Sequence, residues 1–433
     1  MLTQYKYQTL FHDIKNQVIT NVLKKDTKLD SIREISKRKN LSTTTVEKAY
    51  LQLLVEGYIY SIPKSGYYVS NVEKLVPTKS NTNIIPITTN THDNNALTED
   101  MFDMKTYKSI ISKVINYHPD PLLHECAPNG EVELREEIRK YVLKERDVKC
   151  DVNQIIIGPG IQNLLHVLLS LKDFDTVSYL APGFKKALSM FSLKGYQLFS
   201  QKSITNIVSS HTDYLYISPS NIYPTGETLK IQDRVNLIKW AQENNSYIIE
   251  DDYNFFIKYN NYTVPSIHSL DQSHVIYMGS FSKTLLPSMR ISFMILPQSL
   301  YSLYKEKHLI FSQGVSKLEQ LTLALYLKDG LFYRHTKKLY NTYKRKNDIF
   351  QDSIQQYIDQ SLISVHGVDS NLHVVIDFNN QKTYNNFIRG CTARNYKFTL
   401  IKDNKSILFP YSGIKNEDMH LIMNELLHAK GNL

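Results

Sequence analysis

The sequence predicts an α/β protein preceded by a smaller module of two helices and a hairpin. From about residue 96 onward, short β-branched runs alternate with helical patterns. Several of these runs are apolar on both faces, which is typical of a mostly parallel sheet covered by helices. Residues 1–72 follow a different pattern. A chain of 433 residues exceeds the size at which one core stops growing, so two or more domains are expected.

The positive charge is concentrated in the first part of the chain. The net charge is +9, and residues 1–72 hold eleven Lys and Arg against six Asp and Glu. More than half of the excess therefore lies in a small part of the chain. For this reason the distribution of the charge is more informative than its size.

Three cysteines, Cys126, Cys150 and Cys391, are widely separated and show neither metal-ligand spacing nor a disulfide framework. We therefore expect no metal site and a reducing compartment. No apolar run approaches the roughly 20 residues that span a bilayer, and the N-terminus lacks a signal pattern. The sequence predicts a soluble, cytoplasmic protein.

The composition changes between the two parts of the chain. From Val76 to Asn95 it is rich in Thr, Asn and Pro and poor in helical periodicity, which is typical of a linker. A long loop inside one domain is the alternative, but polar stretches of that length are uncommon in compact folds. We expect a first domain at 1–72, a linker at 73–95 and a second domain at 96–433.

Short apolar runs in the second domain are expected to be its strands. They include Gln154–Ile157, Thr176–Leu180, Tyr214–Ile217, Tyr247–Ile249, Val275–Met278 and Ile291–Leu296. In such sheets ligands gather beyond the carboxyl ends of the strands. From about Tyr333, a basic helix and the expected strand Leu372–Asp377 indicate a smaller α+β subdomain.

The first domain has the order of a helix-turn-helix followed by a wing. Asp30–Lys39 predicts a short helix, Asn40–Ser42 a turn, and Thr43–Glu56 a second helix with one apolar face. Gly57 ends that helix, and Tyr58–Val69 predicts a hairpin. Two helices joined by a tight turn offer the start of the second one to a major groove.

The ordered motifs S-x-R-E, T-x-x-x-A-Y-x-x-L-x-x-E-G-Y and S-G-Y-Y-V resemble the winged-helix domain of GntR-type bacterial regulators over nearly all of residues 5–70. The resemblance implies that Arg33, Thr43, Thr44 and Lys64 contact double-stranded DNA. Hydroxyls at a helix start can bond phosphates or bases, and an arginine can reach either. The alternative is a helical protein-interaction module with solvated charges.

The segment Ser280–Arg290 sets a lysine among hydroxyls directly after an apolar run. An amine attacks an aldehyde only when it is unprotonated, and cationic neighbours together with desolvation can lower the pKa of a lysine enough for that. We expect Lys283 to form a Schiff base, while Ser280 and Arg290 hold a phosphate.

A second phosphate contact is expected at the segment Gly158–Asn163, which opens a helix directly after a strand. The free amides of Gly160, Ile161 and Gln162 predict a phosphate cradle there. Because helix starts are common, this loop alone is weak evidence.

Residues at other strand ends fit a pyridine ring. Asp251 can keep the nitrogen of pyridoxal 5'-phosphate protonated, Tyr253 can bond its phenolic oxygen, and Phe184 can stack on its face. Singly, these residues have simpler explanations as a helix cap, a core phenol and ordinary core. Together, in this order along a βα chain, they predict a pyridoxal phosphate site.

The region from about Ala96 to the end resembles the fold-type I aminotransferases, and its fusion to a GntR-like domain resembles the MocR subfamily. The segments that carry the resemblance are Asn129–Arg135, Ser218–Gly226, Glu250–Tyr253 and Ser280–Arg290. The resemblance covers nearly the full length. It implies a pyridoxal phosphate-bound homodimer, often domain-swapped so that each DNA head lies over its partner's cofactor domain.

The chain departs from the aminotransferase pattern at two places. Aminotransferases place Asn directly before Pro-Thr-Gly, where this chain has Tyr223, and we expect Asn221 to bond the cofactor instead. They also carry a substrate-carboxylate arginine in the C-terminal subdomain, whereas here no arginine follows Arg394 and Ile407–Gly413 is uncharged. Without that bidentate fork, an amino acid would be held loosely.

The sequence therefore predicts a transcription regulator. Its expected effector is pyridoxal phosphate itself, as in PdxR-type members that control vitamin B6 synthesis, or an amine or amino acid that forms an external aldimine. An active aminotransferase with an accessory DNA-binding head is the alternative, and the missing arginine argues against it. A cofactor-free scaffold would be colourless, and the presence of Lys283, Asp251 and Arg290 argues against that reading.

Overall fold

The computed structural model forms two compact units, residues 1–89 and 90–433. It describes residues 6–71, 101–253, 255–257, 259, 264–282, 284–357, 361–368, 372–401 and 405–427. The linker expected at 73–95 lies outside the described residues, and the expected domain limits stay predictions.

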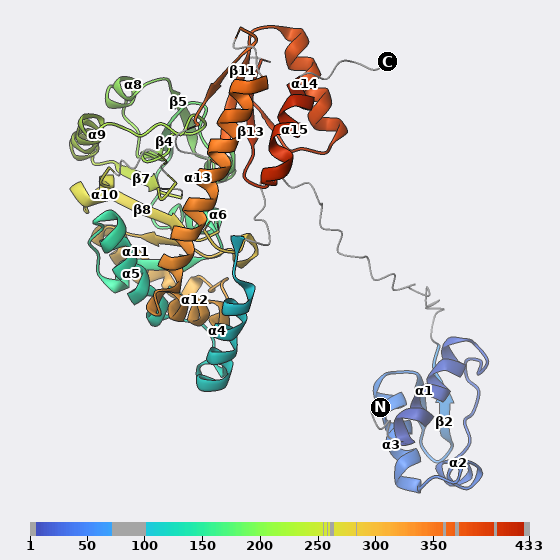
Figure 1. Ribbon diagram of the computed structural model, residues 1–433. Helices are drawn as coiled ribbons and strands as arrows, with labels where there is room; N and C mark the ends of the chain where they lie inside the picture. Colours follow the sequence, from blue (N-terminus) through green and yellow to red (C-terminus); the bar gives the residue numbers. More distant parts are fainter. Residues whose placement is uncertain are drawn as a thin grey trace. The chain divides into compact units, whose positions relative to one another are not determined.

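The described part of the N-terminal unit packs three helices with a two-stranded hairpin (Figure 1). These elements are α1 (Lys6–Ile19), α2 (Ile32–Lys39), α3 (Thr43–Val55), β1 (Ile59–Ile62) and β2 (Gly66–Val69). Their core joins apolar side chains at helical spacing on α1 and α3, among them Leu10, Ile14, Val18, Val46 and Leu53. The predicted helix pair and hairpin are confirmed, and α1 is a further helix that was not predicted.

Local signals in the sequence set the limits of α2 and α3. Ser31 accepts a hydrogen bond from the backbone N–H of Glu34, whose carboxylate accepts from the N–H of Ser31, and these two bonds form a capping box. Ser42 caps α3 by accepting from a backbone N–H in the same way. Gly57, at a φ of +77°, lets the chain turn from α3 toward β1.

The large unit is built on a seven-stranded sheet, with the order β3–β9–β8–β7–β6–β4–β5. Among its described strands, β9 alone runs opposite to the others, so that its pairs with β3 and β8 are antiparallel and the remaining pairs are parallel. The strands are β3 (Ile155–Gly158), β4 (Thr176–Leu180), β5 (Gln197–Gln201), β6 (Tyr214–Ile217), β7 (Tyr247–Asp251), β8 (Val275–Ser280) and β9 (Ser292–Ile295). The predicted mostly parallel sheet is confirmed.

Helices cover both faces of this sheet (Figure 1). Successive strand residues face opposite sides, so that Tyr216 and Ile249 lie in one core cluster and Leu215 and Ile248 in another. The helices are α4 (Met104–Tyr117), α5 (Val132–Arg146), α6 (Ile161–Leu168), α7 (Lys185–Leu193), α8 (Ile204–Val208), α9 (Ile231–Asn244), α10 (Ile267–Leu270), α11 (Gln298–Lys307) and α12 (Lys317–Lys328). Trp240 of α9, the single tryptophan of the chain, is buried and donates to the Ser210 carbonyl at 2.7 Å.

The C-terminal subdomain is an antiparallel sheet in the described order β10–β11–β13–β12, and the long helix α13 leads into it from the large sheet (Figure 1). Its elements are α13 (Leu331–Tyr357), β10 (Ile363–His366), β11 (His373–Phe378), α14 (Gln381–Ala393), β12 (Thr399–Leu400), β13 (Ser406–Pro410) and α15 (Asn416–Leu427). The predicted α+β subdomain is confirmed. Its expected helix begins two residues earlier, at Leu331, and its expected strand is β11.

Candidate functional site

The four side chains expected to contact DNA are all exposed. Arg33 is the second residue of α2, Thr43 and Thr44 open α3, and Lys64 lies in the turn between β1 and β2 at a φ of +63°. Thr43 and Thr44 thus stand at a helix N-terminus, where free amides and the helix dipole favour an anion such as a phosphate group. Their DNA contacts stay predictions.

The register of the large sheet brings several strand ends to one edge. Gly158 at the end of β3 and Ser280 at the end of β8 both pair with Ser292 of β9, which lies between them. Asp251 ends β7, the parallel neighbour of β8. Because β4 and β6 are parallel to β7, the segments that follow them leave the sheet at the same edge. This edge is where a parallel sheet binds its ligands.

Asp251 is a buried carboxylate with one unpaired oxygen. Asp251 as a whole is 3% exposed. Oδ2 accepts a hydrogen bond from Tyr216 Oη, whereas Oδ1 has no partner among the described residues. Burial raises the pKa of Asp251 to about 7, while the bond from Tyr216 lowers it and the charge of Asp252 raises it. An unpaired buried carboxylate oxygen fits the protonated nitrogen of a pyridine ring.

The start of α6 and Arg290 form a polar cradle. Gly160 is the N-cap residue of α6 at a φ of +110°, and a Cβ added there would lie 2.5 Å from Nη2 of Arg290. Arg290 is exposed, and its Nη2 lies 3.5 Å from the carbonyl oxygen of Pro159. Ile161 and Gln162 are the first two residues of the helix. Helix amides beside a guanidinium suit a phosphate group.

Hydroxyl groups cluster beside the lysine segment. Ser292 Oγ donates to Ser280 Oγ at 2.9 Å, and the N–H of Ser282 donates to the same oxygen at 3.2 Å. The Ser282 hydroxyl is buried and has no partner among the residues described. Lys283 itself lies outside the described residues. Ser282 was not among the predicted site residues, although its position directly before Lys283 was a signal.

The residues expected to contact the ring differ in exposure. Phe184, the N-cap residue of α7, is 38% exposed, so its ring is available for stacking. Tyr253 is half-buried; burial raises its pKa, and Asp251 and Tyr223 raise it further. Asn221 is buried. Asp251 and Tyr253 lie two residues apart, at the end of β7 and just beyond it.

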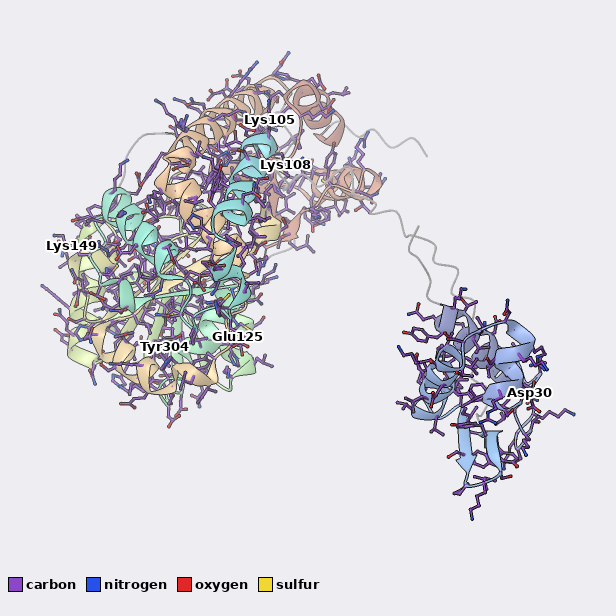
Figure 2. All side chains as sticks on the ribbon, turned by 90° about the horizontal axis from the view of Figure 1, so that it is seen from below. Asp30, Lys105, Lys108, Glu125, Lys149 and Tyr304 are labelled. Carbon is purple, nitrogen blue, oxygen red and sulfur yellow. The ribbon has the colours of Figure 1, made fainter. Side chains whose placement is uncertain are left out.

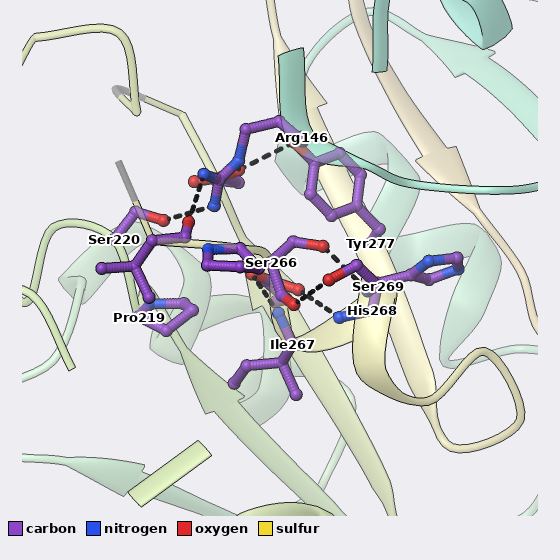
Figure 3. Close-up of polar contacts among 12 residues, drawn as sticks. Arg146, Pro219, Ser220, Ser266, Ile267, His268, Ser269 and Tyr277 are labelled. Carbon is purple, nitrogen blue, oxygen red and sulfur yellow. Dashed lines mark hydrogen bonds and ion pairs between the residues drawn. The ribbon is translucent and has the colours of Figure 1, made fainter. Parts of the chain in front are cut away.

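Arg146, which the sequence interpretation missed, links two loops of the site. It is the last residue of α5 and is buried. Its Nε donates to Asp252 Oδ2 at 2.6 Å, and its Nη2 donates to Ser220 Oγ at 2.7 Å (Figure 3). Asp252 and Ser220 are each adjacent in sequence to an expected cofactor contact. Arg146 therefore ties the segment that follows β7 to the loop that contains Asn221.

Glu250 ties the same strand end to α10. Its two carboxylate oxygens accept from the N–H groups of Ile267 and His268 at 3.0 and 2.9 Å (Figure 3). A carboxylate at a helix start is favoured by the free amides. Burial nevertheless raises the pKa of Glu250 to about 7, with a further rise from Asp252 and a lowering by Arg146.

The segment 407–413, where an aminotransferase would carry its carboxylate-binding arginine, is a packed part of the C-terminal core. Tyr411 is buried, stacks on Phe350 with ring centroids 4.7 Å apart, and donates to Asn347 Oδ1 at 3.0 Å. Ser412 beside it is buried as well. These side chains offer hydroxyl groups and an aromatic ring in place of a cation.

The described residues contain neither a candidate metal-binding cluster nor a candidate membrane-spanning helix. Within the described residues, there is no cluster of three or more His, Cys, Asp or Glu that could hold a metal ion. No helix in the described ranges has both the length and the apolar character that crossing a membrane requires.

Two family models match the chain. "Bacterial regulatory proteins, gntR family" matches residues 6–69, and "Aminotransferase class I and II" matches residues 92–410. The chain is similar to the uncharacterized HTH-type transcriptional regulator YhdI of Bacillus subtilis, with 31% identity covering 98% of this chain and 95% of that protein.

Two further relatives have more specific names. The probable rhizopine catabolism regulatory protein MocR of Rhizobium meliloti is 25% identical over 79% of this chain and 76% of its own length. The pyridoxine biosynthesis regulator PdxR of Corynebacterium glutamicum is 24% identical over 85% of this chain and 82% of its own length. The solved α-aminoadipate aminotransferase LysN of Thermus thermophilus shares the fold, with a TM-score of 0.69, 18% identity and coverage of 78% of this chain and 91% of LysN.

Proposed function

Because the chain belongs to the MocR-type regulators, which join a GntR-type DNA-binding domain to an aminotransferase class I and II domain, we propose that pyridoxal phosphate bound in its large unit controls operator binding by its N-terminal unit. The chain is a DNA-binding transcription regulator with an aminotransferase-like domain. That fold family depends on pyridoxal phosphate.

The observation that carries the proposal is the unpaired Oδ1 of Asp251. Leaving a buried carboxylate oxygen without a partner is costly, so a ligand that donates a hydrogen bond there is favoured. The cradle of Gly160 and Arg290 belongs to the same edge of the sheet and suits an anion. A cationic ring nitrogen and a phosphate on one small molecule match both features.

Each expected contact then has a role in binding pyridoxal phosphate. Asp251 holds a proton on the ring nitrogen, Phe184 stacks on the ring, and Tyr253 and Asn221 bond its phenolic oxygen. The phosphate is held by Gly160, Ile161, Gln162, Ser280, Ser282 and Arg290. When bound, the cofactor supplies an aldehyde carbon and an electron-withdrawing ring. Lys283 is the nucleophile that would fix the cofactor to the chain.

We propose pyridoxal phosphate itself as the effector. The packed, uncharged segment around Tyr411 offers no guanidinium for the carboxylate of an amino acid. The name of the relative PdxR, a pyridoxine biosynthesis regulator, supports control of vitamin B6 synthesis. An amine that reacts with the bound cofactor is the other effector class.

The proposal includes partners and location. Arg33, Thr43, Thr44 and Lys64 would contact an operator in double-stranded DNA, and the working form would be a cytoplasmic homodimer, with a domain swap as one arrangement. A GntR-type domain in each subunit suits a two-fold operator.

An active aminotransferase with an accessory DNA-binding head is the second candidate. The buried carboxylate of Asp251 favours it, since a protonated ring serves catalysis as well as binding. Incubation of the cofactor-loaded protein with a panel of amino acids and a keto acid separates the two functions. Rapid keto-acid turnover would contradict a role in regulation alone.

The central experiment is a titration of the purified full-length protein with pyridoxal phosphate. Visible absorbance reports cofactor binding, and the affinity for DNA from upstream of its own gene reports regulation. We expect both to change together. Borohydride reduction followed by mass spectrometry should place a pyridoxyl group on Lys283, and its absence there would refute the cofactor assignment.

A further inference from the structure

The polypeptide enters the described part of the large unit through two buried residues. Met101 and Phe102 are the first described residues of the large unit, eleven and twelve residues after its first residue, Asn90. Both side chains are buried. Asp103 then caps α4 by accepting from the N–H of Thr106 at 3.0 Å. Met101 and Phe102, which we call the anchor, therefore lie directly before the capped start of α4.

The two anchor residues belong to two core clusters, each of which also holds residues close in sequence to expected cofactor contacts. Met101 shares a core cluster with Ile257 and Tyr259, which follow the expected phenol contact of the β7 loop. Phe102 shares a different cluster with Phe281, which precedes the lysine in sequence. Because protein interiors are close-packed, a shift in either segment is felt at the anchor.

His335 of α13 connects Phe102 directly to the lysine segment. The rings of Phe102 and His335 meet edge to face, with centroids 5.2 Å apart. Nε2 of His335 donates to the carbonyl oxygen of Thr284 at 2.5 Å, and Thr284 directly follows Lys283. Burial lowers the pKa of His335, although the bond to Thr284 opposes this. In a neutral ring the proton would sit on Nε2, because the carbonyl oxygen that it faces can only accept.

We propose that His335 and the anchor form a relay from Lys283 to the connection that leads to the DNA-binding unit, an inference that rests on the proposed function. A covalent change at Lys283 displaces the backbone it shares with Thr284. His335 follows through its hydrogen bond, and Phe102 follows through the ring contact. Coupling between two sites requires an element whose arrangement both sites bias, and the proposal assigns that role to the anchor. His335 is a positioning residue here.

Phe102→Leu tests the relay in the full-length protein, because it removes the ring contact and leaves Thr284 untouched. Cofactor affinity and absorbance should stay within about twofold of the wild type. The cofactor-induced change in DNA affinity should fall to within about twofold, from the roughly 5- to 150-fold typical of coupled sites. Phe387→Leu makes the same change in the buried core of the C-terminal subdomain and should leave coupling intact.

Two variants of His335 test the hydrogen bond. His335→Leu removes the donor, so it should shift the absorbance maximum of the lysine-bound cofactor and reduce coupling together. His335→Gln has an amide that can donate to the same carbonyl, and it should restore both readouts in part. A merely structural role would change thermal stability without this spectroscopic rescue.

The outcomes separate the relay from the proposed function. Undiminished coupling in Phe102→Leu, or equal loss in Phe387→Leu, overturns the relay and leaves the proposed function standing. A wild-type protein whose DNA affinity ignores pyridoxal phosphate overturns the proposed function itself, and the relay with it.

Discussion

The two units hold their candidate contacts in opposite ways. In the N-terminal unit the expected DNA contacts are exposed, and ion pairs such as Arg38–Asp30 lie at the surface (Asp30 is labelled in Figure 2). In the large unit Arg146, Glu250 and Asp251 at the sheet edge are buried, and Arg290 of the phosphate cradle is the exposed exception. A polyanion is bound by many screened, partly interchangeable charges. A small ligand is bound by a few desolvated groups, none of which has a substitute.

This comparison predicts that single substitutions in the large unit have larger effects than substitutions in the N-terminal unit. The largest effect is expected from Lys283→Ala, which removes the amine that we propose reacts with the cofactor aldehyde. Visible absorbance of the bound cofactor and its effect on DNA affinity should both be lost completely. Mass spectrometry after borohydride reduction checks the result, and an unchanged spectrum would contradict the assignment.

The second prediction sets a buried ion pair against an exposed one. Arg146→Met leaves Asp252 buried without its cation and should destabilise the large unit by about 3–5 kcal/mol. Arg38→Met breaks the exposed pair with Asp30 and should cost about 0–1 kcal/mol. Denaturant unfolding of the two variants measures both values. Equal effects would remove the physical distinction between the units.

The third prediction concerns the ring contact. Asp251→Asn should weaken pyridoxal phosphate binding by about 1.5–3 kcal/mol, roughly 10- to 150-fold, because a charge-assisted hydrogen bond is lost. Absorbance titration gives the dissociation constant. Tyr216→Phe, which removes the neighbouring hydroxyl and keeps the carboxylate, is the matched control and should have a smaller effect.

The fourth prediction is a pH dependence of the cofactor-free protein. Burial raises the pKa of Asp251 and of Glu250 to about 7 in the folded state, above their ordinary values of 3.8 and 4.5. Stability from these groups is fully present below those ordinary values and is lost as the pH rises toward about 7. Denaturant midpoints across this window should fall, and Asp251→Asn should flatten the curve. A rise of the denaturant midpoint with pH in the unsubstituted protein would contradict the assignment.

The smallest effect is expected from Arg33→Ala in the N-terminal unit. If the guanidinium contacts a phosphate, the slope of log affinity against log salt should fall by about 1. If it contacts a base, discrimination at one operator position should fall by about 1–3 kcal/mol. Footprinting over a salt series distinguishes a phosphate contact from a base contact. A normal footprint at every salt concentration would show that Arg33 does not contact the DNA.

The elements with strong local signals could be predicted from the sequence. The predicted strands Thr176–Leu180 and Tyr214–Ile217 match β4 and β6 at both ends. By contrast, β5 at the edge of the sheet was missed, because its largely exposed residues lack the apolar run of a buried strand. The strand that carries Asp251 was predicted two residues too short, since two carboxylates interrupt its apolar pattern.

The site could be predicted only as far as its contacts lie near one another in the sequence. Motif order gave the expected ring and phosphate contacts, which stay predictions. Arg146 was missed because its partner Asp252 lies 106 residues away, and His335 was missed because Thr284 lies 51 residues away. No local pattern marks a residue whose role depends on such a distant partner. Only the register and packing of the folded chain reveal it.

The buried Trp240 is a natural fluorescent probe that reports on the large unit alone. Since no other tryptophan occurs in the sequence, indole emission follows the melting of the large unit and is silent about the winged-helix head. Tyrosine signals arise from both units. Heating the protein while recording the two emissions would therefore show directly whether the head and the body melt as one cooperative block or one after the other.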